Sequence, residues 1–217
     1  MVKENRTELV FILDRSGSMS GLESDTIGGF NAMLARQKAE PGEARVTTVL
    51  FDDHYELLHD RINISAISPI TNKDYYVAGS TALLDAIGKT IHKIGNVQKQ
   101  TSEVQRADKV MFIITTDGME NASREYSSDK IKHMIEHQTS KYSWEFIFLG
   151  ANIDALDTAQ KFGIRPDNAA NYCADSEGTA LNYDAVSKVV SEFRSTGYVS
   201  TQWKEEIDAD YAKRSRS

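Results

Sequence analysis

Short apolar runs alternate along the chain with stretches whose apolar residues recur at helical spacing. Four runs rich in apolar or β-branched residues are predicted to form buried strands: 9–13, 45–51, 110–114 and 144–149. Five stretches show apolar residues three or four positions apart and are predicted to form helices: 27–34, 84–94, 131–135, 156–162 and 181–193. Strands that alternate with helices are typical of a parallel sheet with right-handed crossovers.

Two weaker segments extend the predicted sheet. Asp52 and Asp53 form a turn signal, after which 55–58 can return as an antiparallel hairpin partner of 45–51. The segment 171–173 is predicted to be an edge strand. The pattern therefore predicts a Rossmann-like, doubly wound α/β fold with a mostly parallel sheet, one antiparallel edge hairpin and helices on both faces.

The chain contains no internal repeat and no linker rich in Pro, Gly or Ser. We expect one domain over residues 1–200 and a helical or frayed tail over 201–217. In that tail acidic residues come first and basic residues last, which favours a helix because the charges complement the helix dipole.

Composition narrows the functional classes. The chain has 217 residues, and 25 basic against 32 acidic residues give a net charge of −7, which disfavours a nucleic-acid-binding surface. The single cysteine, Cys173, cannot form a disulfide within the chain, so we expect a reducing, cytoplasmic compartment. The apolar run near the N-terminus ends at Asp14, which is too short for a membrane span.

Three loops next to predicted strands and helices carry hard oxygen ligands. Asp14, Ser16 and Ser18 follow the first strand, Thr81 precedes a predicted helix, and Asp117 follows the strand 110–114. Ligands of doubly wound sheets bind beyond the carboxyl ends of the strands, so these loops are expected to meet there. Two carboxylates and three neutral hydroxyls suit a hard divalent cation that keeps part of its shell for water or an outside ligand.

These residues resemble the metal-ion-dependent adhesion site of von Willebrand factor type A domains. The resemblance rests on Asp-x-Ser-x-Ser at 14–18, Gly-Ser-Thr at 79–81 and Thr-Asp-Gly at 116–118, and it covers about residues 7–193. It implies that Asp14, Ser16, Ser18, Thr81 and Asp117 are metal ligands, with Asp117 acting through water. The run after Asp117 and the segment 144–152 look like a branch of small stand-alone bacterial and phage members.

The resemblance also implies a function without catalysis. We expect Mg²⁺, or Mn²⁺ or Ca²⁺ in its place, and a protein partner whose carboxylate completes the shell of the ion. No nucleic acid and no membrane are expected as partners, and the chain is expected to be a monomer. Five side chains are expected to ring the ion and touch the partner: Arg15, Met19, Ser20, Glu120 and Asn121.

Other interpretations of the same residues remain open from the sequence. Asp14 and Ser18 could cap the first helix, Thr81 could cap the helix after it, and Asp117 could belong to a simple turn. Asp14 could also be the nucleophile of a Mg²⁺-dependent phosphoryl-transfer enzyme. An EF-hand fails because Met19 stands where its glycine is required, and no glycine-rich phosphate loop occurs.

A zinc-dependent hydrolase is the second alternative. His133, Glu136 and His137 match the inverted zincin pattern His-x-x-Glu-His. The two histidines lie one helical turn apart and could share a zinc ion, with a third ligand from Glu192, Glu205 or Glu206. The helix must use its apolar side against the sheet, so the histidines are expected on its solvent side.

Overall fold

Six strands form one sheet in the order β3-β2-β1-β4-β5-β6 in the computed structural model, which describes residues 5–215. Only β3 runs antiparallel to its neighbour. The strands are β1 (Arg6–Asp14), β2 (Glu43–Phe51), β3 (Tyr55–Asn63), β4 (Lys109–Thr116), β5 (Glu145–Gly150) and β6 (Ala169–Asn171). The predicted doubly wound α/β fold with an antiparallel edge hairpin is confirmed.

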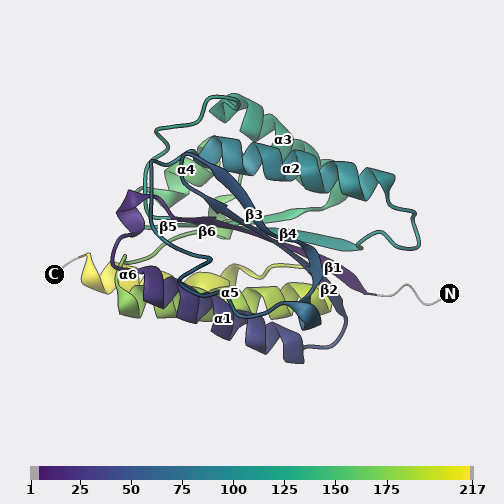
Figure 1. Ribbon diagram of the computed structural model, residues 1–217, viewed down its shortest axis with the longest axis horizontal. Helices are drawn as coiled ribbons and strands as arrows, with labels where there is room; N and C mark the ends of the chain where they lie inside the picture. Colours follow the sequence, from purple (N-terminus) through teal and green to yellow (C-terminus); the bar gives the residue numbers. More distant parts are fainter. Residues whose placement is uncertain (1–4, 216–217) are drawn as a thin grey trace.

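Helices cover both faces of the sheet, with α2, α3 and α4 on one side and α1, α5 and α6 on the other (Figure 1). They are α1 (Glu23–Ala39), α2 (Leu83–Gln100), α3 (Ser128–Tyr142), α4 (Ala155–Lys161), α5 (Ser176–Thr196) and α6 (Glu205–Arg214). None of the helices in the described part of the chain has the length and apolar character needed to cross a bilayer.

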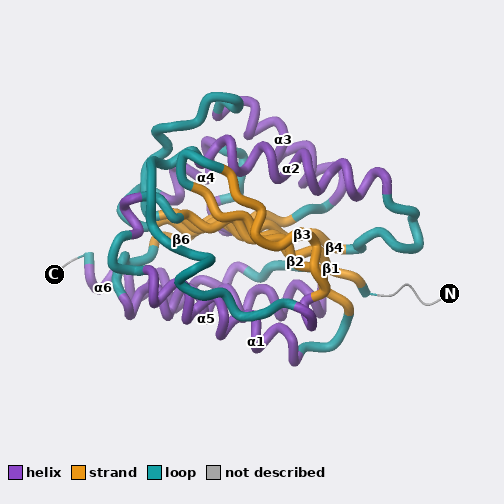
Figure 2. Tube along the Cα trace, viewed as in Figure 1, coloured by secondary structure: helices purple, strands orange, loops and turns teal. Residues whose placement is uncertain are grey.

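Alternation along the central strand divides the core in two, as the layers in Figure 2 show. Leu9, Phe11 and Leu13 of β1 pack towards α1 and α5, whereas Val10 and Ile12 pack towards α2. All five side chains are at most 2% exposed. This explains why the strand is a continuous apolar run: both of its faces are buried.

The winding direction changes between β1 and β4. From β1 the chain proceeds outwards through β2 to β3, and then returns to place β4 on the other side of β1. The crossovers diverge there, so the loops after these two strands open a crevice at the carboxyl edge. Asp14 is the last residue of β1, and Thr116 is the last residue of β4.

Two strands differ from their predicted bounds. β3 extends to Asn63, five residues beyond the predicted end at 58, and pairs with β2 through a bulged register. β6 covers Ala169–Asn171 instead of 171–173. Ala169 and Ala170 are fully buried, and alanine carries little strand propensity, so the apolar pattern missed this edge.

The C-terminal segment packs against the core. Ile207 of α6 is 1% exposed, and the indole N–H of Trp203 donates to the carbonyl of Asp167 at 2.9 Å. The predicted tail is therefore helical as far as Arg214. The predicted boundary after residue 200 stays a prediction, and the chain ends that these ranges include, 1–4 and 216–217, lie outside the described residues.

Candidate metal centre

Asp14 is fixed across the switch point between β1 and β4. Its side chain is 1% exposed, and one carboxylate oxygen accepts the backbone N–H of Ser16 at 2.7 Å. The other oxygen accepts the hydroxyl of Thr116 at the end of β4. The sequence analysis missed Thr116, although it stands beside Asp117 in the same motif. Asp14 is thereby held at the crevice by both neighbouring loops.

Three hydroxyl groups from two loops converge on one point of this crevice. A Cβ atom built on Gly118 would lie 2.9 Å from Ser18 Oγ, 3.0 Å from Thr81 Oγ1 and 3.7 Å from Ser16 Oγ. The hydroxyls of Ser16 and Ser18 are 3.1 Å apart. A side chain at position 118 would therefore intrude on these oxygens, which explains the glycine directly after Asp117.

Asp117 is the least satisfied group of the site. The residue is 2% exposed, and neither carboxylate oxygen has a hydrogen-bond partner among the described residues. Burial raises the pKa of Asp117 to about 6, and the nearby charge of Asp14 adds to the rise, although the hydroxyl of Ser18 opposes it. Burial also raises the pKa of Asp14, against the hydrogen bonds from Ser16 and Thr116.

This donor set fits a hard divalent cation. An unpartnered buried carboxylate is costly, and a second carboxylate beside it makes ionisation harder still. A cation between them would stabilise both ionised forms, and the three hydroxyls would add neutral oxygen ligands. Asp14, Ser16, Ser18, Thr81 and Asp117 are the residues that could hold it.

Helix capping does not account for the same residues. α1 begins at Glu23 after Leu22, and α2 begins at Leu83 after Ala82. Neither residue at the N-cap makes a side-chain hydrogen bond to its helix. The hydroxyls of Ser18 and Thr81 are therefore not used as caps, and the capping interpretation is wrong.

The loop after β4 sets the position of Thr81. Asn121 accepts the backbone N–H of Thr81 through its side-chain oxygen at 2.9 Å, and the N–H of Asn121 donates to the carbonyl of Thr81 at 3.0 Å. Glu120 accepts the N–H of Leu84 in the first turn of α2 at 2.9 Å. These contacts join loops far apart in the sequence, so spacing alone could not reveal them.

The rim differs from the one expected. Arg15 and Met19 are buried, at 4% and 3% exposed, and cannot meet a partner. The guanidinium of Arg15 lies 3.0 Å from Asp52 and 2.5 Å from Glu56, which explains its burial. Three expected rim positions keep some exposure: Ser20, Glu120 and Asn121.

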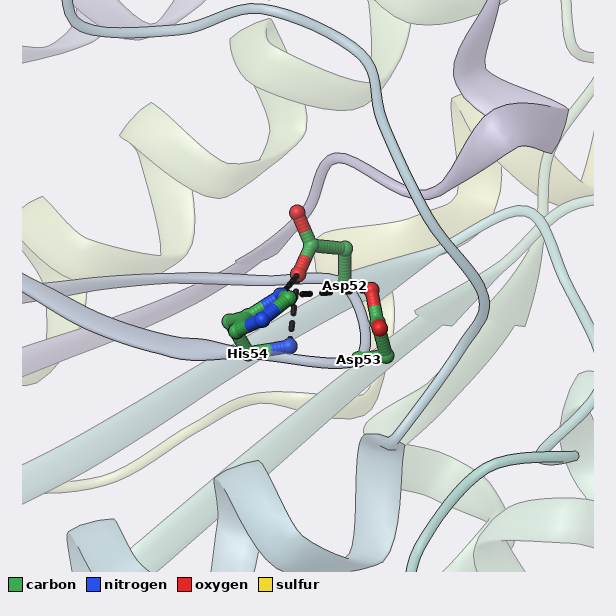
Figure 3. A group of neighbouring side chains, drawn as sticks. All are labelled: Asp52, Asp53 and His54. Atoms are coloured by element: carbon green, nitrogen blue, oxygen red, sulfur yellow. Dashed lines mark hydrogen bonds and ion pairs between the residues drawn. The ribbon is translucent and has the colours of Figure 1, made fainter.

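A group of possible ligands lies in the turn between β2 and β3. Asp52, Asp53 and His54 bring three ligand atoms within 4.8 Å of one another (Figure 3). Asp52 already pairs with Arg15 at 3.0 Å and accepts the backbone N–H of His54 at 2.6 Å. Its carboxylate is thus used to close the turn, and Asp53 and His54 are exposed.

The zinc interpretation gains no support from the geometry. His133, Glu136 and His137 are exposed on α3, and His133 Nδ1 lies 2.7 Å from the carbonyl of Asp129. Within residues 5–215, the turn at 52–54 is the only group of three His, Cys, Asp or Glu residues placed to share a metal. None of the three glutamates proposed as a third ligand joins the histidines: Glu192, Glu205 and Glu206.

Sequence comparison finds no matching protein-family model and no matching curated protein. Solved structures do match. Proximal thread matrix protein 1 from the mussel byssus, with a zinc-occupied metal-ion-dependent adhesion site, matches at TM-score 0.58 and 13% identity, over 88% of this chain and 47% of that chain. A von Willebrand factor type A protein from Catenulispora acidiphila matches at 0.59 and 12%, over 86% and 42%.

A third match is the manganese-loaded TRAP protein of Plasmodium vivax, at TM-score 0.56 and 15% identity, over 82% of this chain and 73% of that chain. The present chain spans about half the length of the mussel and Catenulispora structures, at 47% and 42%. Identities this low speak for the fold alone. The chain has the fold of von Willebrand factor type A domains.

Proposed function

We propose that this chain is a metal-dependent protein-binding module. Asp14, Ser16, Ser18, Thr81 and Asp117 would hold a divalent cation at the carboxyl edge of the sheet. The observation that carries the proposal is the buried carboxylate of Asp117, which lacks a partner, beside hydroxyls that converge on Gly118. The related structures with zinc or manganese give independent support.

The donor set also favours an acidic partner. Three of the five ligands are neutral hydroxyls, so the protein would leave net positive charge on a divalent ion. A hard cation of this kind prefers a further oxygen ligand, and a carboxylate binds it most strongly. We propose Mg²⁺ as the resident ion, with Mn²⁺ or Ca²⁺ as substitutes, and an Asp or Glu side chain of a partner protein as the outside ligand.

A polar hollow beside Thr81 could receive the rest of the partner segment. It has a volume of about 590 Å³, and its lining includes Ser80, Lys89 and Arg124. Met119, at the rim, is 72% exposed and offers an apolar contact. The partner contact we propose therefore shifts from Arg15 and Met19, which are buried, to the loops around Thr81 and Asp117.

We propose no catalytic role for the site. A phosphoryl-transfer nucleophile needs a free carboxylate oxygen, whereas both oxygens of Asp14 accept hydrogen bonds, from Ser16 and Thr116. We further propose that the chain works as a monomer in the cytoplasm of a bacterium or its phage. The half-buried, unpaired Cys173 supports a reducing compartment.

Affinity purification with and without a chelator tests the function. The wild-type chain should retain its partner in millimolar Mg²⁺ and release it when the metal is removed. Thr81→Val, which removes one hydroxyl ligand, should lose the partner. Thr115→Val is the matched control, since Thr115 is also buried at this edge but makes no contact with the converging hydroxyls. Retention of the same partner by Thr81→Val, or in chelator, would overturn the proposal.

A further inference from the structure

A second cavity lies at the opposite, amino edge of the sheet. It has a volume of about 400 Å³ and is lined by the C-terminal halves of α2 and α3, the loop before β4, and Trp144. This volume falls in the usual range of small-molecule sites. The eight residues of β4 separate the two edges, so at about 3.3 Å per residue the cavity is roughly 20 Å from the candidate metal centre.

Gln98 gives this cavity an unused hydrogen-bonding group. The residue lines the cavity and is only 8% exposed. Both atoms of its amide, the oxygen and the nitrogen, lack a hydrogen-bond partner among the described residues. Buried amides are nearly always paired, so an unpaired one facing a cavity points to a ligand that pairs with it.

The surface of α2 is open beside Gln98. Gly95 lies three residues earlier, on the same side of the helix, and also lines the cavity. A Cβ atom built on Gly95 would meet only the side-chain nitrogen of Gln138, at 3.8 Å. The glycine therefore leaves room where another residue would fill part of the cavity.

The remaining walls combine flat rings with positive charge. Trp144 is 4% exposed and stacks on Phe112 with ring centroids 5.5 Å apart. Lys99 and Arg106 contribute two cationic side chains to the lining, against one acidic side chain from Asp108. This excess is notable in a chain whose net charge is −7. The cavity thus favours an anionic ligand with a planar ring.

We propose that this cavity binds a mononucleotide. The amide of Gln98 presents a donor beside an acceptor, and the edge of a nucleobase offers the complementary pair in one plane. Trp144 offers an apolar ring beside the base, and Lys99 and Arg106 attract the phosphate. Such a site recognises the base, so it requires no glycine-rich phosphate loop, and the sequence has none.

Calorimetric titration of the full chain with AMP, GMP, CMP and UMP tests this proposal. At least one of the four should bind the wild type. Gln98→Leu should weaken that binding about tenfold, the effect of losing a buried hydrogen-bonded pair. Gln100→Leu is the matched control, because Gln100 is exposed at the end of the same helix and should leave binding unchanged. Gly95→Leu, which fills the cavity, should abolish binding.

Inorganic phosphate and the four nucleosides separate the two halves of the ligand. Each should bind more weakly than the nucleotide. Gln98→Leu should also unfold at the same or a higher temperature than the wild type, because it removes two unpaired buried atoms, so a loss of binding is not a loss of fold. Absence of binding by all four nucleotides, or equal binding by Gln98→Leu, overturns the proposal, as does phosphate alone binding as tightly.

Discussion

At the scale of the residue, the side chain that decides the account is Asp117. Its carboxylate is buried and unpartnered, and its pKa is raised to about 6. Asp117→Asn keeps the shape and removes the charge, so the metal-free variant should be more stable than the wild type by about 1 kcal/mol. Urea unfolding in chelator measures this, and a less stable variant would contradict it.

The same variant should lose its response to metal. A ligand that binds only the native state at one hundred times its Kd stabilises the wild type by about 2.7 kcal/mol, and this gain should be absent from Asp117→Asn. Thermal unfolding with and without millimolar Mg²⁺ gives the comparison. An equal rise in melting temperature for both proteins would remove Asp117 from the site.

A second residue predicts how stability depends on pH. Burial lowers the pKa of His59 below its usual 6.5, and its ring lies 3.0 Å from the hydroxyl of Thr48. Below pH 6.5 the unfolded chain takes up a proton at this histidine before the folded chain does, so stability should fall as the pH drops. His59→Gln should flatten the slope between pH 7 and 5, measured by denaturant unfolding; an unchanged slope would contradict the assignment.

At the scale of the element, the loop after β4 is held by the start of α2. Glu120 accepts the backbone N–H groups of Leu84, Ala122 and Ser123, so one carboxylate closes the loop and caps the helix. Glu120→Ala should cost about 1–2 kcal/mol, the usual worth of a helix cap. It should also weaken metal binding, because the loop positions Asp117.

Arg124→Ala is the control for that variant, since Arg124 lies in the same loop and is exposed. Chemical unfolding and metal titration of both variants check the prediction. If Glu120→Ala keeps full stability, or if both variants weaken alike, the capping role is wrong.

The elements that sequence could predict are those with one dominant signal. The runs 9–13 and 110–114 are buried on both faces and are therefore continuously apolar, and both are strands of the sheet. The short strand of Ala169 and Ala170 escaped, because packing between helices selects small residues there. The rim residues Arg15 and Met19 were misplaced, because only tertiary pairing with Asp52 and Glu56 buries the arginine.

At the scale of the molecule, the candidate site depends on the sheet, and the sheet follows from the alternation of elements. Sequence spacing indicated which loops carry Asp14, Thr81 and Asp117, since parallel strands end at one edge. The supporting contacts from Thr116 and Asn121 could not be predicted, because they join segments 102 and 40 residues apart.

The C-terminal segment should also stabilise the whole fold. Trp203 and Ile207 are 7% and 1% exposed, and Lys204 donates to the carbonyl of Ala169 at 2.7 Å. Ending the chain after residue 200 should cost about 3 kcal/mol or more, from the apolar surface left uncovered. Thermal unfolding checks this, and a truncated chain as stable as the full one would show that α6 contributes nothing.

Calorimetric titration of Mn²⁺ tests the central claim most directly, with Ser18→Ala compared against Ser20→Ala. Both serines are exposed in the same loop, but only Ser18 Oγ lies with the hydroxyls near Gly118. The wild type and Ser20→Ala should bind one ion with equal affinity, and Ser18→Ala should bind it about tenfold more weakly. Equal affinity for all three proteins, or no binding by the wild type, would contradict the account.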